Sequence, residues 1–76
     1  MNNPRRKKLS KLMEQIEDLK CQLEEILDEE QEAFDNIPEN LEGGERYEKA
    51  EECVSALEDA VGNLEECIEN IETAIE

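Results

Sequence analysis

Residues 51–72 read EECVSALEDAVGNLEECIENIE and nearly repeat every seven residues. Each unit opens with two acids, a small residue and an aliphatic residue, and Leu57, Leu64 and Ile71 close the three units. Apolar residues that alternate at spacings of three and four are typical of helices that pack along one stripe. The same spacing extends from Tyr47 to Ile75. The stretch therefore predicts one long amphipathic helix with paired acids on its outer side.

A second run with the same spacing occupies the first half of the chain. Leu9 takes position a of the heptad and Leu12 position d, and the pattern continues to Ile37. Asn3 is the expected N-cap, with Pro4 as the first helical residue. Pro38 and the Gly43-Gly44 pair are expected to break the helix. These signals predict a single domain with helix one at about 4–35, a connector at about 36–44 and helix two at about 45–75.

The predicted fold is all-α, an antiparallel helical hairpin with coiled-coil-like heptad packing. Two helices of equal length with a short connector favour this topology. Antiparallel pairing would place the basic start of helix one beside the acids near the end of helix two. Ile37 and Leu41 would then cover the connector end of the core.

The apolar stripes are three heptad positions wide, which is broader than a two-helix seam requires. Met13, Leu27 and Phe34 add position e in helix one, and alanines and cysteines add position g in helix two. We therefore expect two hairpins to associate as a homodimeric four-helix bundle. The expected core and dimer contacts are Leu19, Leu23, Ile26, Leu57, Val61 and Leu64.

Acidic residues dominate the composition. The 76 residues include 8 basic and 23 acidic ones, for a net charge of −15. Residues 1–13 hold five basic residues and no acid. No apolar run follows this basic start, which argues against secretion and against a membrane span. Three cysteines without a secretory signal indicate free thiols in a cytoplasmic protein.

No catalytic arrangement is apparent, and we expect neither an enzyme nor a cofactor. The chain lacks histidine, the commonest general base, and its two serines have no evident activating partner. Cys21 falls at an outward position, and Cys53 and Cys67 lie fourteen residues apart on the flank of a packed stripe. That spacing favours small filler residues over a metal or redox site.

Two segments resemble binding motifs without meeting their requirements. DEEQEAFDNIPE, residues 28–39, has acids at several positions of a calcium loop, but Ala33 replaces the glycine of the sharp turn. PRRKKLSKL, residues 4–12, followed by heptads, is similar to a basic leucine zipper. Its basic run is too short to cross a major groove, and the acidic remainder repels phosphates. We expect no metal site and no direct binding to nucleic acid.

The paired acids of helix two form a predicted outward ridge that allows two interpretations. They are either a solvated coat or a surface that binds a basic partner, and the net charge exceeds what solubility requires. The second interpretation predicts an inhibitor that mimics nucleic acid and occupies the basic, nucleic-acid-binding surface of a host protein. The alternative function is a structural or adaptor helical-bundle module. The predicted partner-binding residues are Glu51, Glu52, Glu58, Asp59, Glu65 and Glu66.

Residues 28–48, DEEQEAFDNIPENLEGGERYE, carry a resemblance to a known group. The stretch resembles small uncharacterised acidic helical proteins of phages and mobile elements of Gram-positive bacteria. The likeness is best over the connector and weaker along the heptads. It implies no functional residue, but a mobile-element setting favours an inhibitor of host defence, such as restriction or CRISPR effectors.

Overall fold

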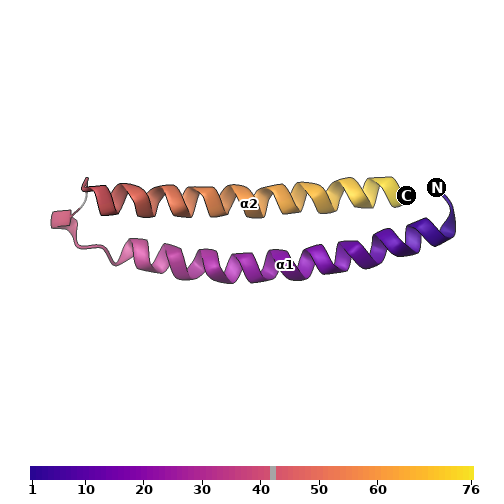
Figure 1. Ribbon diagram of the computed structural model, residues 1–76, viewed down its shortest axis with the longest axis horizontal. Coiled ribbons are helices and arrows are strands. Elements are labelled where there is room, and N and C mark those ends of the chain that lie inside the picture. Colours follow the sequence, from indigo (N-terminus) through magenta and orange to yellow (C-terminus); the bar gives the residue numbers. More distant parts are fainter. Residues whose placement is uncertain (42) are drawn as a thin grey trace.

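The computed structural model describes residues 1–41 and 43–76 and forms a helical hairpin (Figure 1). Helix α1 spans Asn3–Asp35 and helix α2 spans Glu45–Ile75, with one 3-10 turn, η1, at Glu39–Leu41 between them. The helices run antiparallel in an elongated rod whose Cα atoms extend over 59 × 15 × 13 Å. The part of the chain that the structure describes contains no strand. The all-helical hairpin is thus present in a single copy of the chain.

The start of α1 differs from the expected cap by one residue. Asn2 is the N-cap, and its side-chain Oδ1 accepts a hydrogen bond of 2.9 Å from the backbone N–H of Arg5. Asn3 lies inside the first turn, where its Oδ1 accepts a 3.2 Å hydrogen bond from the Arg6 guanidinium. Asn2 suits the cap because it leaves Pro4 at the second helical position, where a missing N–H breaks no intrahelical bond.

The connector ends α1 and reverses the direction of the chain. Short-range backbone hydrogen bonds form where α1 ends. The Asn36 N–H bonds to Glu32 O at 3.1 Å, and the Ile37 N–H bonds to Phe34 O at 3.1 Å. Gly43 has φ +83°, a left-handed conformation in which a side chain would be strained. The aromatic rings of Phe34 and Tyr47 pack with centroids 4.9 Å apart and close this end of the seam.

Ile37 is half-buried beneath the connector, whereas Leu41 is 47 % exposed. The expectation that both residues cover the end of the core therefore holds for Ile37 and not for Leu41. Leu41 lies in η1, where its N–H bonds to Pro38 O at 2.9 Å.

The seam between the helices is narrow: among the described residues, only Val54 and Ile68 have less than a tenth of their surface exposed. Both lie at position a of α2. Most of the half-buried residues of α1 occupy positions a and e. Position d of α1 does not enter the seam, unlike the expected heptad packing: Leu12, Leu19 and Ile26 are 50 %, 54 % and 49 % exposed. One apolar edge of α1 therefore remains outside the hairpin.

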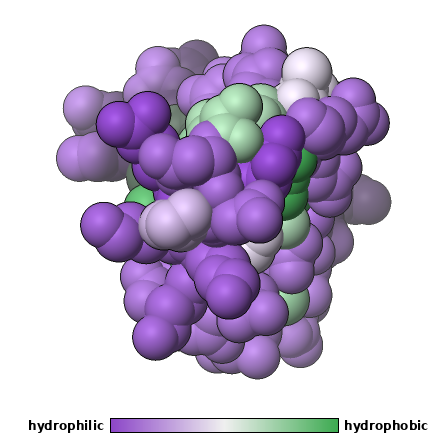
Figure 2. Space-filling model, turned by 90° about the vertical axis from the view of Figure 1, so that its right-hand side faces the viewer, coloured by the Kyte–Doolittle hydropathy of each residue, from purple (hydrophilic) through white to green (hydrophobic). Residues whose placement is uncertain are grey.

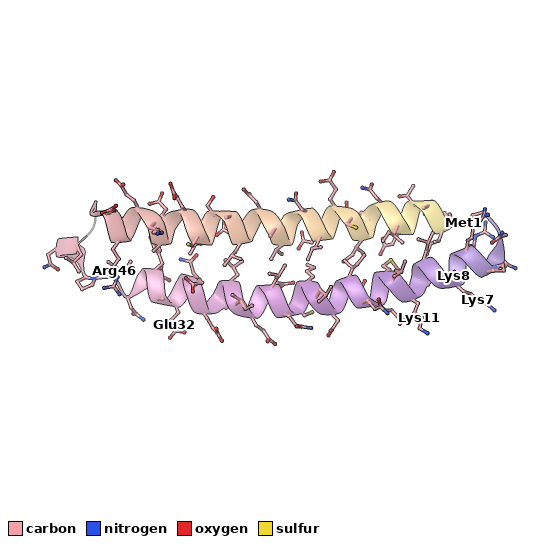
Figure 3. The ribbon with its side chains drawn as sticks, in the orientation of Figure 1. Met1, Lys7, Lys8, Lys11, Glu32 and Arg46 are labelled. Atoms are coloured by element: carbon pink, nitrogen blue, oxygen red, sulfur yellow. The ribbon has the colours of Figure 1, made fainter. Side chains whose placement is uncertain are left out.

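The basic start of α1 meets the end of α2 through a backbone carbonyl. The Nε of Arg6 donates a 3.1 Å hydrogen bond to Ile75 O, in the last turn of α2. A cation at a helix C-terminus is favourable because the carbonyls there are unsatisfied and the dipole is negative. Lys7, Lys8 and Lys11 lie at this same end (Figure 3). The basic start thus lies beside the end of α2, as expected, although among the described residues every ion pair within 4.0 Å involves Lys20.

Candidate functional site

The six predicted partner-binding acids all lie exposed on α2. They repeat at heptad positions e and f: position f faces outward, and position e lies beside the seam, where Glu65 borders Ile68. The spacing of seven residues sets one pair about every 10.5 Å along the axis. We call these residues the acidic ridge: Glu51, Glu52, Glu58, Asp59, Glu65 and Glu66. Five of the six make no ion pair with the described residues, so their charges remain available to a partner.

Glu65 is the exception, because it meets a lysine of the other helix. Lys20 Nζ lies 3.2 Å from Glu65 Oε1 and 3.6 Å from Glu24 Oε1. The hydrogen bond that Lys20 donates to the Glu65 carboxylate is the main cause that raises the pKa of Lys20 above 10.5, and it outweighs the opposing effect of desolvation. Lys20 thus joins the two helices on the face where position e of α1 meets position e of α2.

We expect Lys20→Met to lower the melting temperature at pH 7, because it removes both ion pairs and keeps the aliphatic stem. Because the pKa of Lys20 is raised on folding, its stabilising contribution is complete below about pH 10.5 and disappears as pH rises through the raised value. The melting difference between Lys20→Met and the parent chain should therefore vanish at high pH. Thermal unfolding followed by circular dichroism from pH 7 to pH 11.5 measures it.

Lys11→Met is the matched control, since Lys11 is exposed on α1 and makes no ion pair with the described residues. It should change the melting temperature less at pH 7. Equal melting temperatures for the Lys20→Met and Lys11→Met chains would mean that the ion pairs do not stabilise the hairpin.

The face around Lys20 also contains a shallow depression. Glu17, Lys20 and Cys21 of α1 line it together with four residues of α2, namely Glu65, Ile68, Glu69 and Glu72. Five charged residues and a free thiol share the depression, so this face of the hairpin is strongly polar. The residues that line the depression show how the two helices are rotated: position e of each helix lies on this side of the hairpin.

The six predicted core and dimer residues divide into two groups. Leu23, Leu57, Val61 and Leu64 are half-buried in the seam, whereas Leu19 and Ile26 are about half exposed on the outside of α1. The hairpin alone therefore uses only part of the apolar stripe.

Leu19 and Ile26 belong to a second broad face, opposite Lys20 and Glu65. Because position e of both helices marks one side, helical geometry places positions d and g of α1 and positions g and c of α2 on the other. We call this the acid-poor face. Its central residues are Leu12, Gln15, Leu19, Gln22 and Ile26 of α1, and Cys53, Ala56, Ala60, Asn63, Cys67, Asn70 and Ala74 of α2.

Acids are absent from these twelve described positions, although the chain holds 23. Toward the ends of α1 the same positions hold Lys8 and Glu29. All twelve central residues are exposed except Ala60 and Cys67, which are half-buried. By contrast, the end of the rod that carries both termini is mostly hydrophilic (Figure 2). The rod thus separates a neutral, partly apolar face from an acidic remainder.

Sequence reasoning missed this face because it treated the apolar and acidic positions separately. The available signal was the pair of uncharged residues Gln15 and Gln22 beside the leucines of α1, together with Asn63 and Asn70 of α2. Neutral polar residues are unusual at outward positions of so acidic a chain. The heptad pattern alone does not show that these residues share one face, because that depends on how the two helices are rotated against each other.

The cysteines are free and do not converge on one site. Cys21 and Cys53 are exposed and Cys67 is half-buried. Within the described residues, no three His, Cys, Asp or Glu side chains are placed to hold a metal ion. Asp28–Asp35, the larger part of the calcium-like segment, is helical and cannot form a loop around an ion. In residues 1–41 and 43–76, no helix combines the length and the apolar character needed to cross a membrane.

Comparisons of the chain with protein-family models, with curated proteins and with solved structures find no match. A functional assignment therefore depends on the residues of the chain and on their geometry. The two features that a partner would meet are the acidic ridge and the acid-poor face.

Proposed function

We propose that the chain is a small non-catalytic interaction protein that binds the basic, nucleic-acid-binding surface of another protein. Two hairpins associate into a homodimeric four-helix bundle, and the acidic ridges of both copies face outward. The separation of charge supports this function. The acids avoid one broad face and cover the rest of the rod, as expected if the neutral face packs and the acidic surface binds.

The charge density of such a dimer supports mimicry of nucleic acid. Two copies of net charge −15, along a rod of 59 Å, give one net negative charge per roughly 2 Å. Duplex DNA carries one per about 1.7 Å of its axis. A basic groove that attracts DNA by its field would attract the rod similarly, because long-range attraction depends on charge density more than on chemical identity. The dimer itself would not bind nucleic acid, since both are negative.

The resemblance of residues 28–48 to acidic helical proteins of phages and mobile elements suggests which partner this would be. A DNA- or RNA-binding effector of host defence, of the restriction or CRISPR type, presents the required basic surface. The chain would act as its inhibitor by occupying that surface in the bacterial cytoplasm.

A capture experiment tests the proposed function. The immobilised chain is incubated with nuclease-treated bacterial lysate at about 50 mM salt, and retained proteins are identified by mass spectrometry. We expect retained DNA- or RNA-binding proteins that are released at about 500 mM salt and displaced by excess duplex DNA. A poly-glutamate peptide of equal net charge is the control for plain ion exchange, and it should retain less of the specific partner.

A structural or adaptor module is the second candidate, and the exposed Leu12, Leu19 and Ile26 favour it. An adaptor that holds its partner in an apolar groove would show little salt dependence. Retained proteins that resist about 500 mM salt and are not displaced by DNA would overturn the mimic and leave the adaptor.

A further inference from the structure

The middle of the acid-poor face remains open in a single hairpin. Leu12, Leu19 and Ile26 form a row at intervals of seven residues and are each about half exposed. The flanking residues of α1 are the uncharged Gln15 and Gln22. Across the face, α2 presents mainly alanine, cysteine and asparagine. Large side chains on one helix thus lie beside small side chains on the other.

The size and the charge of this face suit a second copy of the chain. The rod measures 59 Å by 15 Å in the plane of both helices, about 900 Å², which is comparable to the ~800 Å² that each partner buries in a stable interface. Two copies of net charge −15 repel each other wherever their acids meet. Only the acid-poor face allows close contact without placing acid against acid.

We infer that two hairpins join through their acid-poor faces with the two α1 helices antiparallel and a two-fold axis at Leu19. The inference specifies the interface and orientation of the homodimer in the proposed function, on which it rests. Leu19 is the midpoint of α1, which spans Asn3–Asp35. Leu12 and Ile26 lie seven residues to either side. Rotation about Leu19 therefore overlaps the two helices fully and places Leu12 opposite Ile26 of the second copy.

Charge favours antiparallel α1 helices over parallel ones. Lys8 precedes Leu19 by eleven residues and Glu29 follows it by ten, and both occupy position g. The antiparallel orientation places Lys8 near Glu29 of the second copy, twice by symmetry. A parallel pairing of the α1 helices would place Lys8 on Lys8 and Glu29 on Glu29. Glu29, the one acid at positions d and g of α1, thus meets an opposite charge in the antiparallel pairing of the α1 helices and not in the parallel pairing.

The same two-fold axis also brings the α2 helices of the two copies into close contact. Two contacts fix the axial register of α1 against α2: the rings of Phe34 and Tyr47 pack together at one end, and Arg6 bonds to Ile75 O at the other. By that register, Leu19 lies level with a point on α2 between Ala60 and Cys67. Ala60 of one copy then faces Cys67 of the other. Small residues at such positions let helix backbones approach to the short end of the usual 8–10 Å range.

Site-directed crosslinking tests the orientation in a background of Cys21→Ser, Cys53→Ala and Cys67→Ala. Leu19→Cys lies on the proposed axis and should form a symmetric disulfide-linked dimer on oxidation. Leu12→Cys alone should not, because its two copies would lie about 21 Å apart along the axis. A mixture of Leu12→Cys and Ile26→Cys chains should crosslink with each other. Sedimentation equilibrium of each variant before oxidation shows whether the dimer is intact.

Charge reversal provides a second readout that requires no cysteine. Lys8→Glu and Glu29→Lys should each weaken the dimer several-fold, and the double variant should regain the parent affinity, since both pairs are restored with the signs exchanged. Leu19→Glu should raise the dissociation constant about 100-fold, because it places two carboxylates together at the axis. Circular dichroism identifies any variant that fails to fold.

The outcomes separate this inference from the proposed function. An intact dimer in which Leu12→Cys crosslinks to itself, or in which Leu19→Cys does not crosslink, would overturn the orientation and leave the dimer. A folded chain that sediments as a monomer would overturn both the orientation and the dimer. If Leu19→Glu then also abolished partner capture, the acid-poor face would be the binding site of that partner.

Discussion

Val54→Asp should leave most of the chain unfolded at 25 °C and produce the largest loss of stability of any single change considered. Val54 is 7 % exposed and, with Ile68, is one of the two most buried residues of the seam. The change removes about 1.5–3 kcal/mol of valine burial. It also buries a carboxylate that has no partner, which costs several kcal/mol more. A rod with so narrow a seam has little stability to lose.

Ser55→Asp is the matched control, because it adds the same charge one residue further along α2 at an exposed position. Helicity at 222 nm and thermal unfolding of both variants measure the contrast. We expect the Ser55→Asp chain to unfold within a few degrees of the parent. A Val54→Asp chain that kept its helicity and a cooperative transition would show that the seam does not hold the helices together.

Neutralising the acidic ridge should produce the largest loss of partner binding. Glutamates 51, 52, 58, 65 and 66 are changed to Gln and Asp59 to Asn, which preserves shape and removes six charges. At roughly 0.5 kcal/mol per exposed charge pair, affinity for the captured partner should fall about 100-fold. The salt dependence of binding should become shallower, because fewer charges are paired in the complex. Titration of the partner at two salt concentrations measures both effects.

The control removes six acids from α1, where Glu14, Glu17, Asp18, Glu24, Glu25 and Asp28 are neutralised. Both variants change the net charge from −15 to −9. Each also loses one of the two carboxylates that meet Lys20, so the sets are balanced in that respect as well. The control should weaken binding less and only through the long-range field. Unchanged affinity and salt dependence in the ridge variant would show that the ridge is a solvated coat, and the adaptor function would then be favoured.

Much of the fold follows from local patterns. The three-four spacing predicted two long helices, and α1 and α2 begin and end within one residue of the expected bounds. Pro38 and the two glycines marked the connector, because they oppose helix for reasons that do not depend on distant contacts. The exposure of the acidic ridge was also predictable, since positions e and f of α2 are not part of its apolar stripe.

The contacts between the helices were less predictable. The Lys20 ion pair with Glu65 and the Arg6 bond to Ile75 depend on the axial register of α1 against α2. The heptad repeat leaves that register open, because a shift of seven residues preserves the pattern. The connector length and the packing of Phe34 on Tyr47 select one register.

By itself the sequence determined the helices, their break and the side of each helix that is apolar, because hydrogen bonding within a helix and side-chain period are local properties. Only the tertiary structure decided the rotation of α1. Its stripe is wider than one seam, so α2 can cover just part of it. Packing against α2 uses positions a and e and leaves Leu12, Leu19 and Ile26 outside. That rotation creates the acid-poor face, since it aligns the leucines of α1 with the small, uncharged residues of α2.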